Sequence, residues 1–356
     1  MTQFAYVGCR TTRARNARGE GISVYKIDPR TAGWSLIQVL RTEENPSFLA
    51  LHPTLDILYS VHGDLDLVTS YSILPDGRIA PAGRQSTRGR NPVHLALDLT
   101  GRWLVVANYR TDSVVSLPAD DGGALGAVAD LCEMKGTLGP HKVEQNYGRP
   151  HHAPFSPSGK WVVVPEKGND RITVLRLDAA SGRLGIVHHV SCRENAGPRH
   201  IAFHPSLPKA YVINELDSTV TTYDFDDQAG TLTGIDVVSA LPRCFCGNSR
   251  ASEIEISADG RHLYTSNRGH NSITTFSIDG DGQLTPGHFT PSQGETPRFF
   301  AIAPDQRHLY VANEDSDTIV PFQRHGDGSL TPAADVIRVG SPTSMVFRDA
   351  TRTASA

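Results

Sequence analysis

The sequence lacks the features that would place the chain in a membrane, in an oxidising compartment or on a nucleic acid. No apolar run approaches the roughly 20 residues that a membrane-spanning helix needs. The 5 cysteines are odd in number and irregularly spaced, which argues against a disulfide framework and indicates reduced thiols. A net charge of −4 leaves no basic footprint for nucleic acid or an anionic membrane. We therefore expect a cytoplasmic protein with a small ligand.

Three functional signatures are also missing. Residues 1–10 read as a strand, with no charged segment followed by an apolar one, so no signal peptide is expected. The G-x-S-x-G motif is absent, which disfavours a covalent acyl-enzyme on serine. A metal site could draw on His151, Glu166 and Glu215, but their spacing is not that of a compact ligand set, and we expect no metal or other cofactor.

What the sequence does contain is a repeated unit, most clearly seen in residues 197–226. Short segments of alternating apolar residues, at 200–203, 210–214 and 219–225, are separated by turns rich in Gly, Pro, Asn and Asp. Period-two apolarity between such turns is typical of short antiparallel strands. A sheet of this size with one buried face cannot stand alone, so neighbouring units must cover it.

The same pattern recurs along the whole chain. If the turn residue after the first strand is used as the anchor, successive anchors lie 45 to 58 residues apart, at Pro53, Leu99, Pro157, Pro205, Ala258, Pro304 and Asp349. A period in the forties with about four strands per unit predicts a β-propeller. We expect an all-β fold in which residues 1–356 form a single seven-bladed propeller domain.

The last unit is incomplete and predicts how the ring closes. Residues 345–349 supply a first strand, and the missing second strand matches residues 4–10 in pattern. We expect the N- and C-terminal strands to share one blade, which removes free sheet edges.

Two sets of equivalent positions should form rings near the channel, although the sequence does not fix their relative height. The entry to the first strand carries Ser47, Val93, His151, Arg199, Ser252, Arg298 and Thr343. The end of the second strand carries Gly63, Tyr109, Lys167, Glu215, Arg268, Glu314 and Arg10. Ionisable members concentrate in blades four to seven, as expected for one asymmetric ligand. The alternative is a water-filled channel mouth whose charges merely pair with one another.

Other repeated features indicate structure or pocket walls. The position before the second ring carries Asn108, Asn214, Asn267 and Asn313, which we interpret as turn locks because Asn bonds turn backbone and tolerates unusual φ. Two long connections, 118–149 and 241–252, lead into first strands. We expect them on the rim that carries His151 and Arg199, either as pocket walls or as solvated loops.

The motifs GPRHIAFHP, YVINELDSTVTTYDFD, SEIEISADGRHLYTSNRGHNSITTF and TPRFFAIAPDQRHLYVANEDSDTI closely resemble the seven-bladed propeller lactonases of the 6-phosphogluconolactonase type, which include fungal carboxy-muconate cycloisomerases. The resemblance covers nearly the whole chain and is strongest from about 149 to 325. It implies a cofactor-free site at one end of the channel, with catalytic His151, Arg199, Glu215 and Arg268. One departure concerns the substrate: the family's His-x-His-Ser run is replaced by Arg149-Pro150-His151-His152-Ala153.

These residue types suit the opening of a sugar lactone. Either Glu215 or His151 can serve as general base for a water. The guanidinium groups of Arg199 and Arg268 stay protonated and suit a carboxylate, a phosphate or the tetrahedral oxyanion. Lys167, Arg298 and Arg10, together with His152, are candidates for binding an anionic substrate.

We therefore expect a hydrolase acting on a small anionic sugar lactone, with 6-phosphogluconolactone the default from the resemblance. One alternative is a lactonising cycloisomerase, in which the same arginines hold a dicarboxylate. Another is a non-catalytic binding propeller, which needs no convergent acid and base. The oligomeric state does not follow from the sequence.

Overall fold

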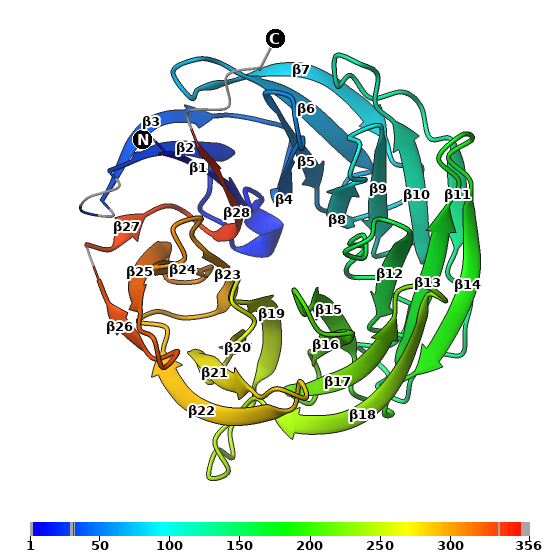
Figure 1. Cartoon of the computed structure of the whole chain (residues 1–356). Coiled ribbons are helices and arrows are strands. Elements are labelled where there is room, and N and C mark those ends of the chain that lie inside the picture. The colour runs from blue at the N-terminus through cyan, green and yellow to red at the C-terminus, as the bar shows by residue number, and fades with distance from the viewer. Residues whose placement is uncertain (1–2, 29–30, 32, 334, 350–356) are drawn as a thin grey trace.

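The computed structural model describes residues 3–28, 31, 33–333 and 335–349. These residues form strands and turns, with one short 3-10 helix, η1 (Arg13–Arg15). Seven sheets of the described chain stand around a common axis, with the first strand of each sheet nearest to it (Figure 1). The predicted all-β, seven-bladed propeller is confirmed. No helical segment of the described residues has the length and apolar composition to cross a membrane.

The blades follow the chain, each ordered from the axis outward. Blade 1 contains β28 (Pro342–Asp349), β1 (Gln3–Cys9), β2 (Ile22–Ile27) and β3 (Trp34–Leu40). Blade 2 contains β4 (Pro46–Leu51), β5 (Ile57–His62), β6 (Leu67–Ile73) and β7 (Ile79–Ser86). Blade 3 contains β8 (Pro92–Leu97), β9 (Trp103–Asn108), β10 (Ser113–Pro118) and β11 (Asp130–Glu133). Because β11 lies within residues 118–149, this connection is partly the outer strand of blade 3.

The second half of the ring is built in the same way. Blade 4 contains β12 (Trp161–Glu166), β13 (Arg171–Leu177) and β14 (Leu184–Ser191). Blade 5 contains β15 (Pro198–Phe203), β16 (Lys209–Asn214), β17 (Thr219–Asp226) and β18 (Thr231–Ser239). Blade 6 contains β19 (Arg250–Ile256), β20 (His262–Arg268), β21 (Ser272–Ile278) and β22 (Leu284–Pro291). Blade 7 contains β23 (Pro297–Ile302), β24 (His308–Asn313), β25 (Thr318–Arg324) and β26 (Leu330–Pro332), with β27 (Ile337–Arg338) also pairing with β25.

Blade 4 differs from the expected repeat at its inner edge. Where the pattern predicts a first strand, the chain pairs with β12 only through isolated bridges of Pro150 with Glu166 and Phe155 with Val162. The physical reason is Pro154, which lies in the middle of the segment and has no N–H to give to a ladder; Pro150 stands where β4, β8, β15, β23 and β28 also begin with a proline. His151 therefore lies on an irregular segment.

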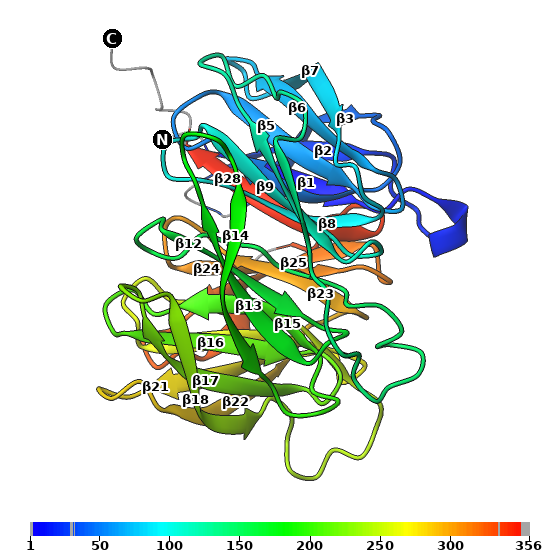
Figure 2. The same cartoon turned by 90° about the vertical axis from the view of Figure 1, so that its right-hand side faces the viewer.

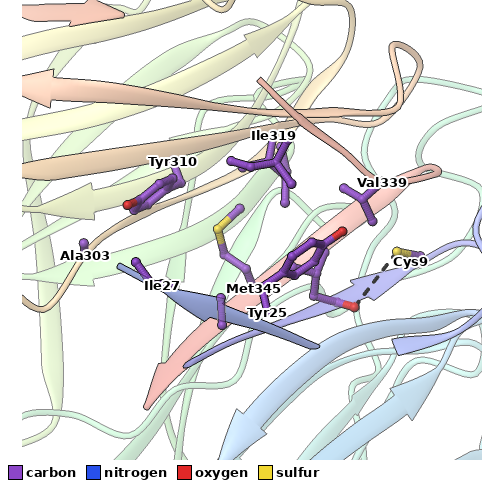
Figure 3. Packing of buried hydrophobic residues seen from close by; sticks show 12 residues of the cluster. Cys9, Tyr25, Ile27, Ala303, Tyr310, Ile319, Val339 and Met345 are labelled. Atoms are coloured by element: carbon purple, nitrogen blue, oxygen red, sulfur yellow. Dashed lines mark hydrogen bonds between the residues drawn. The ribbon is translucent and has the colours of Figure 1, made fainter. Parts of the chain in front are cut away.

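The ring closes as the sequence predicts. Strand β1 pairs antiparallel with β28, with Phe4 opposite Arg348 and Val7 opposite Met345. Behind this pair, Met345, Tyr25 and Cys9 are buried in a cluster that also includes Tyr310 of blade 7 (Figure 3). The shared blade thus buries apolar surface against a neighbouring blade as well as completing its own ladder.

Asparagine side chains tie adjacent blades together, in a way that differs from the expected turn locks. The amides of Asn108, Asn267 and Asn313 donate to the carbonyls of Thr87, Ala240 and Ser292, which follow the outer strand of the preceding blade. None of these asparagines has a positive φ. The same amides also donate to Ser or Thr hydroxyls of their own hairpin, and Asn214 donates only there, to Thr219 and Thr221. The asparagines therefore fix their hairpin turns, and three of them also join blades, without an unusual φ.

A second tie between blades uses buried tyrosines of the second strands. The hydroxyls of Tyr6, Tyr59, Tyr211 and Tyr264 donate to the carbonyls of Gly77, Gly123, Gly282 and Gly328 in the next blade, at 3.0, 2.6, 2.8 and 3.1 Å. Glycine is required at Gly77, where φ is +86° and a Cβ would lie 2.3 Å from the Phe4 ring. Each bond joins a side chain to the backbone in a buried interface.

We predict that Tyr59→Phe and Tyr211→Phe each lower the free energy of unfolding by about 1–2 kcal/mol, because each leaves a buried carbonyl without its donor. The two bonds share no partner, so the double variant should lose about the sum. Urea denaturation of the three variants and the wild type measures this. A double variant as stable as the wild type would show that these hydroxyls do not hold the blades together.

Candidate active site

An extra residue in the inner strands presents the first ring of side chains to the axis. The pairing of inner with second strand shifts register between Pro46 and Phe48, Pro92 and His94, Pro198 and His200, and Pro297 and Phe299. The residue after each proline is therefore unpaired, as in a β-bulge, which redirects a side chain. As a result the neighbours Arg199 and His200 both line the axial cavity, which regular alternation would prevent.

Both predicted rings meet at the same end of the channel. A cavity of about 300 Å³ there is lined by Ser47, Val93, His151, Arg199, Arg298 and Thr343 of the first ring and by Arg10, Gly63, Tyr109, Lys167, Glu215 and Arg268 of the second. Helix η1 and the connection before β12 lie at this end (Figure 2) and add Arg15, Glu144, Tyr147 and Arg149. The structure thus brings together seven of the eight predicted site residues.

Glu215, which follows β16, lies at the centre of a cluster of charged side chains. Its Oε1 accepts from Lys167 Nζ at 2.6 Å, and its Oε2 lies 3.2 Å from both Arg199 Nε and Arg268 Nη2. The carboxylate is almost fully buried, so these ion pairs are little screened by solvent. The main chain fixes the arginines further: Arg199 Nη1 donates to Ser252 O at 2.7 Å, and Arg268 Nη2 to Ala251 O at 2.9 Å.

This environment sets the charge of each group. Burial alone would raise the pKa of Glu215, but Lys167, Arg268 and Arg199 together hold it well below its usual range. Burial and the nearby Arg268 lower the pKa of Arg199 to about 9, which leaves it protonated at neutral pH. Glu215 is therefore a permanently charged anchor and a very weak base.

A second carboxylate, Glu144, was not predicted from the sequence. It comes from the connection before β12, and its Oε2 accepts from Lys167 Nζ at 2.9 Å and Arg149 Nη1 at 3.0 Å, while Oε1 accepts from Arg250 Nη1 at 2.7 Å. Arg250 comes from the other long connection. The connection before β12 therefore walls the cavity, as one of the two sequence interpretations held, whereas residues 241–249 of the other connection do not line it.

A separate ion pair cluster lies across the cavity. Arg10 Nε is 2.8 Å and Arg298 Nη1 is 3.5 Å from the carboxylate of Glu314, which is partly buried and follows β24. Burial would raise the pKa of Glu314, but Arg298 and Arg10 lower it overall. The two predicted anion-binding arginines are thus held side by side by one carboxylate.

The two adjacent histidines of the sequence motif lie differently. His151 lines the cavity, with its ring 5.4 Å from that of Tyr109, and burial with Arg199 and other cations nearby lowers its pKa well below the usual value, so it is neutral. His152 does not line the cavity; its Nδ1 accepts from the Ile201 N–H, and its ring stacks on His200 at 4.2 Å.

The balance of charge in the cavity favours an anionic ligand. Among the described lining residues, nine cations (Arg10, Arg15, Arg110, Arg149, Lys167, Arg199, Arg250, Arg268 and Arg298) face three carboxylates (Glu144, Glu215 and Glu253). Within the described part of the chain, no group of three His, Cys, Asp or Glu side chains is arranged to hold a metal ion. Glu166 is buried and bonds to Arg171, Asn169 and Thr173.

A closed propeller that gathers buried guanidinium, carboxylate and imidazole groups around one axial cavity has the build of an enzyme for a small anionic substrate. Residues 4–347 match the family model described as lactonase, 7-bladed beta-propeller. The chain belongs to this family of lactonases.

Individual relatives agree with this assignment. The chain is 32% identical over 309 residues to a 6-phosphogluconolactonase of Bacillus subtilis, covering 85% of this chain and 86% of that protein, and 31% identical to one of Serratia proteamaculans, covering 85% of each. Among solved structures, the periplasmic gluconolactonase of Pseudomonas aeruginosa superposes with a TM-score of 0.89 at 28% identity, covering 98% of this chain and 100% of that one.

We predict that Glu215→Gln lowers the free energy of unfolding at pH 7 by about 3 kcal/mol or more, because it leaves Arg199 and Arg268 without their anion and Lys167 with Glu144 alone. Since the folded pKa of Glu215 is depressed, its contribution is complete above the unfolded pKa of about 4.3 and is lost as the pH falls through the lower folded value. The difference in the free energy of unfolding between the wild type and Glu215→Gln should therefore shrink below about pH 4.

Urea denaturation from pH 3.5 to 8 checks this prediction. Glu144→Gln is the matched control, because its carboxylate also pairs with Lys167 but is more exposed, 15% against 5%. It should lose less stability. Equal losses in the two variants would contradict the central role of Glu215.

Proposed function

We propose that the chain hydrolyses an anionic sugar lactone, with a 6-phosphogluconolactone the first candidate. The observation that carries this proposal is the cluster of Lys167, Arg199 and Arg268 around Glu215, next to neutral histidines in a cavity with surplus positive charge. The names of the relatives, 6-phosphogluconolactonase and gluconolactonase, favour a sugar lactone as substrate.

The carbonyl oxygen of the lactone would bind near Arg199 and Arg268. Ring opening by water turns this oxygen into an oxyanion, and protonated guanidinium groups already held in place stabilise the new charge at little reorganisation cost. Both arginines are anchored by Glu215 and by main-chain carbonyls, so they need not move during the reaction. Their part is to polarise the ester and stabilise the tetrahedral intermediate.

The water needs a proton acceptor, and the cavity favours a histidine over Glu215. A carboxylate whose pKa is held well below the usual range takes up a proton too weakly to act as general base near neutral pH. His151 and His200 both line the cavity and are neutral, because burial and Arg199 lower the pKa of each. We therefore assign Glu215 the role of anchoring the cations. We assign the uptake of the proton from water to one of the two histidine rings.

The substrate's anionic group would bind to cations away from the reacting carbonyl. Arg10 and Arg298 lie together at Glu314, and Lys167 lies between Glu215 and Glu144. Guanidinium pairs suit carboxylate and phosphate oxygens. His152 lies outside the cavity lining, so any effect it has on the substrate would pass through His200. The cytoplasmic location stays a prediction.

We predict that the protein hydrolyses phosphorylated sugar lactones and that Arg199→Met lowers kcat by about 100-fold or more, because one oxyanion donor is lost. Release of acid in a pH-stat, with and without a chelator, measures turnover. A muconate tested in parallel reports the cycloisomerase alternative. Unchanged turnover in Arg199→Met would overturn the site assignment, and chelator-sensitive turnover would require a metal.

We predict that Arg10→Met raises KM for a phosphorylated lactone by about 10-fold or more and leaves KM for the unphosphorylated lactone nearly unchanged, because a charge-assisted bond to the anionic group is worth about 1.5–3 kcal/mol. Michaelis–Menten curves on the matched pair of substrates test this. Arg41→Met, far from the cavity lining and largely exposed, is the control for loss of a charge. Equal effects on both lactones would place the anionic group elsewhere.

A further inference from the structure

Four histidines cluster beside the cavity; His94, His151 and His200 are buried and His152 is partly buried. The ring of His200 lies 5.2 Å from that of His151, 4.2 Å from that of His152 and 6.3 Å from that of His94. The phenyl ring of Phe48 closes the group on one side, 4.6 Å from His94. Their hydrogen bonds separate them into different chemical roles.

Two of the four rings are committed to the main chain. His94 Nδ1 accepts from the Ala153 N–H at 3.1 Å, and His152 Nδ1 accepts from the Ile201 N–H at 3.2 Å. A neutral imidazole whose Nδ1 accepts carries its hydrogen on Nε2. Neither ring therefore has a lone pair free to take a proton from water.

His200 has the opposite arrangement. Its Nδ1 lies 2.8 Å from Glu253 Oε1, and the same oxygen accepts from the Ile254 N–H at 3.0 Å. When Glu253 is ionised, Oε1 can only accept, so the hydrogen of the pair lies on His200 Nδ1, which leaves the lone pair on Nε2. Among the described residues Nε2 makes no hydrogen bond, and both His200 and Glu253 line the cavity.

His151 lacks such a partner. Its Nδ1 is buried with no hydrogen bond to any described residue, so nothing fixes its tautomer. A general base gains from a carboxylate that orients its ring and stabilises the imidazolium that forms. Of the two histidines lining the cavity, only His200 has that carboxylate.

We propose that His200 Nε2 is the proton acceptor of lactone hydrolysis and that Glu253 is the residue that positions it, an inference that rests on the proposed function. Nε2 takes one proton of the attacking water while the water oxygen forms a bond to the carbonyl carbon. The ring C–O bond then breaks, and Nε2 returns the proton to the departing alkoxide. The products are the hydroxy acid and a neutral His200, so no other reactant is needed.

The pair also predicts the pH dependence of the reaction. The ionisable groups facing the pair of His200 and Glu253 come from several elements. They are Arg199 on the strand of His200, Glu255 on the strand of Glu253, His94 on β8, His151 and His152 on the segment before β12, Glu215 after β16, and Arg298 on β23. Burial raises the pKa of Glu253 to about 7 against the opposing effect of Arg199. Proton uptake by the pair near this pH removes the ionised carboxylate, so kcat should fall below about pH 7.

The kinetic test uses glutamine variants of the full chain. His200→Gln should lower kcat by about 100-fold or more with little change in KM. Glu253→Gln should lower kcat less and move the acid limb of the pH profile to lower pH, since the variant has no carboxylate to titrate; a merely structural role would leave the limb in place. The control is His94→Gln, which retains an acceptor for Ala153 and should keep kcat within about threefold.

A second measurement is independent of substrate. Nitrogen-15 NMR of the histidine side chains should show the Nδ1–H tautomer for His200, assigned by its absence in His200→Gln, and the Nε2–H tautomer for His94. An Nε2–H His200, or a His200→Gln variant within threefold of wild-type kcat, would overturn this inference and leave the lactonase proposal standing. A wild-type protein that hydrolyses no sugar lactone would overturn both.

Discussion

Closure of the ring is the constraint on which both fold and site depend. A blade buries its faces only against its two neighbours, so the pairing of β28 with β1 gives blades 2 and 7 a partner they would otherwise lack. The cavity draws residues from every blade, including Arg10 and Thr343 at the closure. The ion pair of Arg10 with Glu314 can form only when the first and last strands have met, whereas the partners of Glu215 come from blades 4 to 6. Closure therefore completes the site.

The repeat then explains how a nearly symmetric scaffold carries an asymmetric site. The same bulge recurs in blades 2, 3, 5 and 7 and turns the residue after the proline towards the axis, whatever that residue is. Blades 2 and 3 place Ser47 and Val93 there, and blades 5 and 7 place Arg199 and Arg298. The backbone supplies equivalent positions and the side chains supply the asymmetry, so the chemistry collects on one side of the channel.

Repetition is also what made much of this predictable from the sequence. Equivalent positions must form rings, which is why the propeller, the closure and most cavity residues were found without coordinates. The orientations of His151 and His152 were not predicted, because the sequence does not show that blade 4 has an irregular segment in place of its inner strand, from which only His151 of the two lines the cavity. Glu144 and the pair of His200 with Glu253 were missed because their partners lie in other blades or in a long connection, at distances that no local pattern encodes.

The electrostatics of the cavity couple the stability of the fold to its ligand. Nine described cations face three carboxylates, and one of these, Glu253, has its pKa raised to about 7 by burial and is only partly ionised at neutral pH. The mutual repulsion of the cations already lowers the pKa of Arg10 to about 9, after the larger effect of burial. The cavity forms only in the folded state, so an anion that relieves this repulsion binds the folded state alone. The free energy of unfolding should therefore rise with the concentration of the anion. The surplus positive charge therefore lowers the stability of the unliganded fold, and relief of that cost would favour the binding of an anion.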